Sequence, residues 1–162
     1  MKLIAVGNYK VKRFNKFAQG IKNNRMIDII LSANLMSKFV EGDCVLVPVP
    51  SRHGYATNTL KLANIIAKRT GAEVLNILEG RSRESFCELK RLGKTYIKGD
   101  FFGFRLKENA SVPKNRKLVL IDNVYATGKT AENAQKAVGQ ECEILVLANA
   151  SIKLKDLIIK GE

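Results

Sequence analysis

The stretch that most constrains the fold is residues 117–130, KLVLIDNVYATGKT, in which an apolar run ends at an acidic residue and a Thr-Gly turn follows. Residues 118–121 are apolar without alternation, which is typical of a strand buried on both faces of a parallel sheet. Gly128 permits a tight turn, and a helix is predicted to begin near Lys129. The amides of this turn would lie at a helix N-terminus, which favours a bound phosphate. Asp122, at the carboxyl end of the strand, is placed to contact a ligand above the sheet.

Strand and helix patterns alternate along most of the chain. Strands are predicted at residues 3–6, 44–49, 73–78, 118–121 and 143–147, and helices at residues 22–39, 57–69, 129–138 and 153–160. The basic segment at residues 10–16 is predicted to be a turn. The alternation predicts an α/β fold with an open, mostly parallel sheet flanked by helices. A chain of 162 residues, 46% of them hydrophobic, is expected to form one domain, residues 1–162.

The chain is strongly basic, with 28 Lys and Arg against 15 Asp and Glu and a net charge of +13. Such a charge favours polyanions, among them nucleic acid, acidic lipid surfaces and multiply phosphorylated substrates. A generally solvated cationic surface and a dedicated nucleic-acid face both fit this composition. No apolar run is long enough for a signal peptide or a membrane span, so we expect a cytoplasmic protein with no membrane partner.

The cysteines and the histidine do not indicate a metal site. Cys44, Cys87 and Cys142 form no CxxC pair, and His53 is the single histidine. Cys44 and Cys142 lie beside apolar runs and are predicted to be small buried hydrophobes. We therefore expect reduced thiols and neither a catalytic cysteine nor a metal bound by protein ligands alone.

Residues 123–130, NVYATGKT, differ from the P-loop pattern GxxxxGK[ST] in lacking its first glycine. That glycine lets the backbone wrap the β-phosphate, which Asn123 does poorly. Too few residues follow Thr130 to supply the later acidic elements of a nucleoside triphosphatase. A P-loop enzyme is therefore disfavoured.

Residues 120–130 resemble the phosphoribosyl pyrophosphate motif of the type I phosphoribosyltransferases: apolar residues, an acidic pair, Val, a spacer and Thr-Gly-x-Thr. Three weaker similarities to the competence-protein ComF branch precede it in order: VPVP at residues 47–50, the Gly54-Tyr55 step, and GDFFGF at residues 99–104. The resemblance implies the type I phosphoribosyltransferase fold. Its core would span about residues 45–150, with a small hood built from the N-terminal segment and the tail.

The resemblance implies that the protein binds phosphoribosyl pyrophosphate with magnesium and transfers ribose 5-phosphate to a nitrogenous acceptor. Asp122 and Asn123 would contact the ribose hydroxyls, and Ser51 and Arg52 would face the pyrophosphate. The residues assigned to the 5′-phosphate are Ala126, Thr127, Gly128, Lys129 and Thr130. Magnesium is expected to be held through the substrate, with no direct metal ligand assigned.

The charged segment at residues 79–99 lacks a clean period beyond one helical turn at residues 86–89, and it resembles the family's flexible lid. Lys90, Arg91 and Lys94 are assigned to this lid, which would close over the substrate and exclude water. The predicted catalytic residues are Asp122 and Arg91. A cationic, dry site would stabilise the departing pyrophosphate.

Asn123 departs from the family, which usually has a second carboxylate there. One negative charge beside the developing ribosyl cation is missing, and ligand binding survives this change more easily than catalysis does. The alternative function is therefore a non-catalytic protein of the same fold that senses a ribose phosphate or binds nucleic acid in DNA uptake. A homodimer is expected because relatives are often dimers, and the acceptor carries no readable motif.

Several aromatic and basic residues have two interpretations. His53 is predicted to lie in an exposed turn, and Tyr125 either stacks near the ligand or fills the spacer. The phenylalanines at 101, 102 and 104 are predicted to be core residues, with a wall of an acceptor-base pocket as the alternative.

Overall fold

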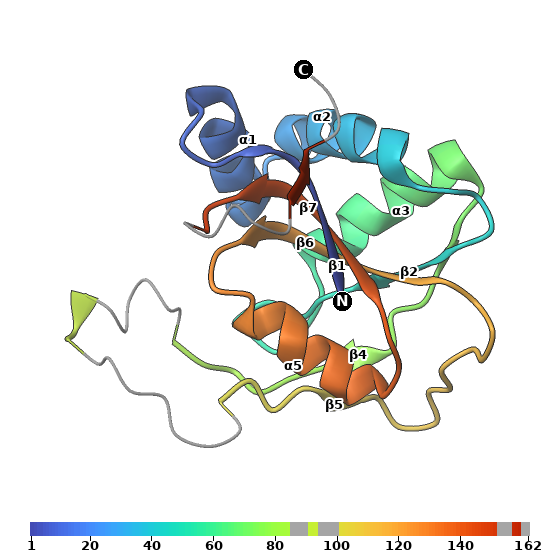
Figure 1. Ribbon diagram of the computed structural model, residues 1–162. Coiled ribbons are helices and arrows are strands. Elements are labelled where there is room, and N and C mark those ends of the chain that lie inside the picture. Colours follow the sequence, from blue (N-terminus) through green and yellow to red (C-terminus); the bar gives the residue numbers. More distant parts are fainter. Residues whose placement is uncertain (85–90, 94–100, 152–156, 160–162) are drawn as a thin grey trace.

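The computed structural model describes residues 1–84, 91–93, 101–151 and 157–159 (Figure 1). Its strands are β1 (Lys2–Asn8), β2 (Val45–Pro48), β3 (Glu73–Val74), β4 (Leu78–Glu79), β5 (Arg105–Leu106), β6 (Leu118–Tyr125), β7 (Glu143–Asn149) and β8 (Leu157–Ile159). Its helices are α1 (Lys12–Lys22), α2 (Met26–Met36), the 3-10 turn Ser37–Phe39, α3 (Asn58–Thr70) and α5 (Lys129–Val138).

Six strands form one sheet in the order β3-β2-β6-β7-β1-β8, and every pairing is parallel. Strand β6, which carries the motif, lies between β2 and β7. The predicted open α/β fold with a parallel sheet is confirmed. Strands β4 and β5 form a separate antiparallel pair.

The two faces of the sheet are covered by different elements (Figure 1). Helices α1, α2 and α3 cover one face, where Val119 and Ile121 of β6 join a core of apolar side chains. Helix α5 and the β4-β5 pair cover the other face, which receives Leu118 and Leu120. All four residues are buried, so the unbroken apolar run is explained by burial on both faces of the sheet.

Four local predictions are corrected by the structure. The basic turn predicted at residues 10–16 belongs to α1, and the single helix predicted at residues 22–39 is α2 followed by a 3-10 turn. The strand predicted at residues 73–78 is two short strands, β3 and β4, which belong to different sheets. The tail was predicted to be a helix, but its residues Leu157–Ile159 form strand β8, because they pair with the edge of β1 that β7 leaves free.

Helix α1 was missed because its cationic residues hide an amphipathic pattern. Phe14, Phe17, Ala18 and Ile21 have helical spacing, and all four contribute to the core beneath α1. Its contact with α2 is close at Gly20, where an added Cβ would lie 1.9 Å from the Asp28 carboxylate. Within the N-terminal segment, β1 is an interior strand of the sheet, between β7 and β8. The hood that we expected this segment to form stays a prediction.

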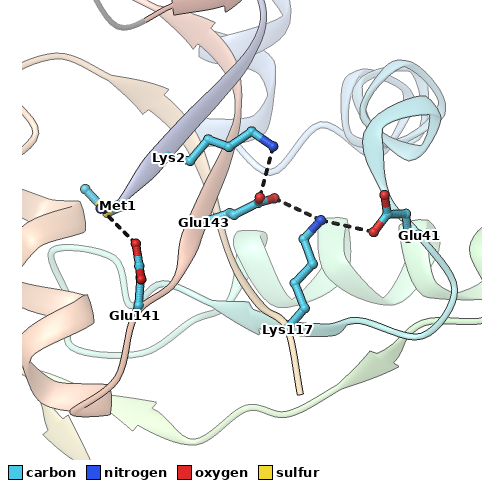
Figure 2. A network of polar contacts seen from close by, with 6 residues as sticks. All are labelled: Met1, Lys2, Glu41, Lys117, Glu141 and Glu143. Carbon is cyan, nitrogen blue, oxygen red and sulfur yellow. Dashed lines mark hydrogen bonds and ion pairs between the residues drawn. The ribbon is translucent and has the colours of Figure 1, made fainter. Parts of the chain in front are cut away.

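The amino-terminal edge of the sheet is held by a charged network (Figure 2). Glu143, at the start of β7, pairs with Lys2 at 3.0 Å and with Lys117 at 3.3 Å. Lys117 also pairs with Glu41 at 3.0 Å. These contacts connect the starts of β1, β6 and β7 and the segment before β2. A cavity of about 190 Å³ is lined by these residues. The charges of Glu41 and Glu143 in its wall are balanced by those of Lys2 and Lys117.

The two described cysteines behave as predicted. Cys44 and Cys142 are free and buried, and burial raises the pKa of Cys142 to about 11. Cys87 lies outside the described residues. Among the predicted core phenylalanines, Phe102 is buried and Phe104 packs against the α5-side core. Within the described ranges, no helix has both the length and the apolar character needed to cross a bilayer.

Candidate functional site

The candidate site lies at the carboxyl edge of the sheet, where β6 leads into α5. Strand β6 is longer than predicted, so Asp122 lies inside it, opposite Val146 of β7. The strand continues to Tyr125, whose carbonyl accepts a hydrogen bond from Ala150 at 2.7 Å. Helix α5 begins at Lys129, as predicted.

The turn between β6 and α5 contains a residue in the left-handed backbone conformation at the start of the helix. Gly128 has φ +80° and is the N-cap of α5. An added Cβ at Gly128 would lie 2.4 Å from the Tyr125 hydroxyl, so glycine is required by both conformation and space. Thr127 Oγ1 accepts a 3.4 Å hydrogen bond from the Lys129 amide. The exposed Thr127 thereby shapes the start of the helix.

A cavity of about 540 Å³ lies over this turn. The predicted ribose and phosphate residues that line it are Asp122, Asn123, Ala126, Thr127, Gly128 and Thr130. Lys129 is exposed and is not among the lining residues, consistent with a solvated first-turn lysine. Tyr125 lines the cavity and its hydroxyl lies against Gly128, and stacking of its ring near a ligand stays a prediction.

The opposite wall of the cavity comes from the N-terminal segment and was not predicted. Tyr9, Ala18, Gln19 and Lys22 line it. Gln19 Nε2 donates a 2.6 Å hydrogen bond to the Tyr9 hydroxyl. This wall was missed because α1 itself was missed; its amphipathic spacing is the signal that could have found it.

Asp122 has an environment that disfavours its charge. Burial raises the pKa of its carboxyl to about 6, against two opposing effects. The backbone amide of Asn123 donates a 2.7 Å hydrogen bond to Oδ1 of Asp122, and the positive charge of Arg83 also favours the ionised carboxylate. Asp122 therefore changes its charge near neutral pH, where a partner that donates hydrogen bonds would select the carboxylate.

The loop after β2, residues 51–55, leaves the sheet beside β6, because the Val49 amide bonds the Ile121 carbonyl at 3.0 Å. The loop is closed by a 3.0 Å hydrogen bond from the Ser51 amide to the Tyr55 carbonyl. Arg52 is exposed, and its Nε lies 3.4 Å from Nε2 of the equally exposed His53. Neither Ser51 nor Arg52 lines the cavity.

Arg83 is the cation that the sequence reasoning missed. Its guanidinium donates a 3.1 Å hydrogen bond to the Ser51 carbonyl and has Asp122 as an electrostatic partner. Among the predicted lid residues, Arg91 is exposed, and its catalytic role stays a prediction. Lys90 and Lys94 lie outside the described residues.

The donor set fits magnesium only as an ion that arrives with a phosphorylated ligand. In the described part of the chain, no group of three His, Cys, Asp or Glu side chains could hold a metal. Asp122 is the carboxylate that lines the cavity. Mg²⁺ commonly uses one or two carboxylates together with substrate phosphates and water, so Asp122 suits that arrangement.

Comparison with known proteins finds a distant similarity to a competence protein. No family model matches it. It is similar to a competence protein. The relative is described as "Competence protein ComFC" from Streptococcus pneumoniae (strain ATCC BAA-255 / R6), and it is 28% identical over 102 residues, 62% of this chain. The match spans 43% of the length of the relative, and it supports the predicted ComF-like relationship.

Proposed function

We propose that this protein binds phosphoribosyl pyrophosphate with magnesium and transfers its ribose 5-phosphate to a nitrogenous acceptor. The observation that carries the proposal is one cavity lined by both Asp122 and the Thr127-Gly128 turn at the start of α5. A carboxylate suits ribose hydroxyls, and free amides at a helix N-terminus suit a phosphate. The two groups match the two ends of a ribose 5-phosphate.

In this mechanism the chain's residues bind and orient. The amides around Thr127 hold the 5′-phosphate, and Asp122 accepts hydrogen bonds from the ribose hydroxyls. The bond between the ribose C1 and the pyrophosphate oxygen breaks, the acceptor nitrogen forms the new bond to C1, and the nitrogen loses a proton. Positive charge near the leaving pyrophosphate stabilises this step, and bound Mg²⁺ would share that charge.

Calorimetric titration with phosphoribosyl pyrophosphate, with and without magnesium, tests the proposal. We expect saturable binding that depends on magnesium and is lost in the double variant Thr127→Ala plus Asp122→Ala. The matched control is Thr70→Ala plus Asp43→Ala, which removes the same residue types outside the cavity. Absence of binding by the native chain, or equal loss in both double variants, would contradict the proposal.

The second candidate is a non-catalytic protein of DNA uptake that senses a ribose phosphate or binds nucleic acid. It is favoured by Asn123, whose side-chain amide donates a hydrogen bond to the Ala18 carbonyl of α1, and by the similarity to a competence protein. The variant Asn123→Asp separates the two: pyrophosphate release in an acceptor screen should rise for a weakened enzyme and stay at zero for a binding protein. Binding of single-stranded DNA, if present, should weaken steeply with salt.

A further inference from the structure

Arg83 occupies an unusual environment for an arginine. Its guanidinium carbon lies 4.7, 5.2 and 5.9 Å from the ring centroids of Phe102, Phe104 and Phe101. The rings also contact one another, with Phe101 edge-on to Phe102 at 5.3 Å. An aromatic enclosure holds a guanidinium in one orientation through cation–π contact while removing part of its water. Burial accordingly lowers the pKa of Arg83.

The same residue donates hydrogen bonds to two consecutive backbone carbonyls of the loop after β2. Its Nη1 donates to the Ser51 carbonyl at 3.1 Å, and its backbone amide donates to the Arg52 carbonyl at 2.8 Å. Two residues back along the chain, the Arg81 carbonyl accepts from the same Nη1 at 3.4 Å. The Gly80 amide adds a 2.9 Å hydrogen bond to the Gly54 carbonyl. Residues 80–83 therefore run along the 51–55 loop and fix its shape.

Arg83 also acts on the cavity through its charge. It and Asp122 each favour the ionised form of the other, so the field of the guanidinium reaches the carboxylate that lines the cavity. A role in packing alone explains the aromatic contacts. It does not explain why the guanidinium also donates to the Ser51 carbonyl while its charge favours the ionised form of Asp122, which lines the cavity.

We propose that Arg83 is the positioning residue of the candidate pyrophosphate loop, holding Ser51 and Arg52 in place and supplying positive potential on the leaving-group side of Asp122. This inference rests on the proposed function. It predicts a selective effect: Arg83 should matter for a ligand that carries the pyrophosphate and not for ribose 5-phosphate, which lacks it.

The test measures the affinities of phosphoribosyl pyrophosphate with magnesium and of ribose 5-phosphate by calorimetry at about pH 8.5, well above the pKa of Asp122, so that its carboxyl is ionised in both the native chain and the variants. Arg83→Gln should weaken the first by on the order of tenfold and leave the second within about twofold. Arg83→Lys keeps the charge and should recover part of the loss. Arg105→Gln is the matched control: it removes the same charge from the neighbouring β5, where Arg105 pairs with Glu79, and should change neither affinity.

The outcomes separate the two proposals. If the native chain binds both ligands and Arg83→Gln weakens both equally or neither, the role of Arg83 is overturned while the proposed function stands. If the native chain binds neither ligand, both proposals fall.

A measurement on the free protein adds an arm that needs no ligand. Carbon-13 NMR of the Asp122 carboxyl should give a higher pKa in Arg83→Gln than in the native chain and no change in Arg105→Gln. An unchanged value in Arg83→Gln would overturn the electrostatic part of the inference. Should Arg83→Gln fail to fold, Arg83→Lys carries the same comparison of the two ligands.

Discussion

The side-chain amide of Asn123 donates a 3.4 Å hydrogen bond to the backbone carbonyl of Ala18. This contact joins the motif strand β6 to helix α1, which forms the opposite wall of the cavity. A carboxylate, which the resembled family usually has at this position, could not make this contact when ionised. The departure from the family motif is therefore coupled to the way the N-terminal segment closes the site.

We expect Asn123→Asp to lower the free energy of unfolding by about 1 kcal/mol at pH 8, because an ionised carboxylate would face the Ala18 carbonyl. At low pH the protonated acid can donate to that carbonyl. The carboxyl would thus have a higher pKa in the folded than in the unfolded chain, so its stability contribution is lost as the pH rises above about 4. Urea unfolding at pH 4.5 and pH 8 measures this. Asn123→Ala is the control, with a deficit that does not depend on pH.

Gly128→Ala should damage the site more than Gly139→Ala. Both glycines have positive φ, +80° and +76°, at the two ends of α5. An added Cβ at Gly139 meets nothing within 4 Å, so only the backbone strain remains, about 1 kcal/mol. At Gly128 the Cβ meets the Tyr125 hydroxyl as well. Thermal unfolding and ribose 5-phosphate titration compare the two variants, and adding Tyr125→Phe should recover part of the Gly128→Ala loss. Equal effects of the two variants would contradict the role assigned to the turn.

Asp122 should make the free protein less stable as the pH rises from about 4 to about 6. Its carboxyl has a raised pKa of about 6 in the folded chain, so the folded state binds more protons than the unfolded state in that range. Asp122→Asn should remove this decline, worth about 1–3 kcal/mol. Urea unfolding at pH 4.5 and pH 7 measures it as the difference between the native chain and the variant. A native chain whose pH dependence matches that of the variant would disprove the assignment.

Glu143 should have the opposite pH dependence. Burial alone raises its pKa, but hydrogen bonds from Lys2 and Lys117 prevail and lower it. Its contribution is therefore present above the unfolded pKa and is lost as the pH falls through the lower folded value. We expect Glu143→Gln to cost about 1 kcal/mol at pH 7, since both lysines are partly exposed to solvent, and less in acid.

The control for the Glu143 prediction is Glu141→Gln. Glu141 is 88% exposed and lies 3.8 Å from the amino terminus. Its replacement should leave the free energy of unfolding unchanged, because an exposed pair at that distance is screened. An equal loss of unfolding free energy in Glu143→Gln and Glu141→Gln would contradict the prediction that the half-buried Glu143 contributes more than the exposed Glu141 to the network in Figure 2.

Elements governed by local pattern were predictable. The buried run of β6 and the bounds of α5 could be read from apolar spacing and from Gly128 and Gly139. The division of residues 73–78 between two sheets could not, because it depends on β4 meeting β5, which lies beyond residue 100. The tail was misjudged because an apolar segment that fits a helix also fits a strand when β1 offers it a free edge.

The site divides in the same way. The residues that follow one another in the motif were predicted and lie together around the cavity. Arg83 and the wall formed by Tyr9, Gln19 and Lys22 reach the site through tertiary packing. The amphipathic spacing of α1 indicates the helix that carries Gln19 and Lys22, whereas no short sequence pattern marks Arg83 as a site residue. Arg83 also lies in a charged segment, and the sequence does not distinguish a half-buried arginine there from a solvent-exposed one.

The position of β1 in the sheet has a consequence for biosynthesis. Leu3 lies in register with Ile144 and Leu157, so β1 pairs with two strands that are synthesised much later than β1 itself. The pairing of β2 with β6 can be completed earlier, whereas β1 must wait until β7 has emerged from the exit tunnel. Parallel pairing between such distant segments is slow to form. Until it forms, the apolar β1 is a nascent strand without its neighbours, and an unpaired apolar strand of this kind is prone to aggregation.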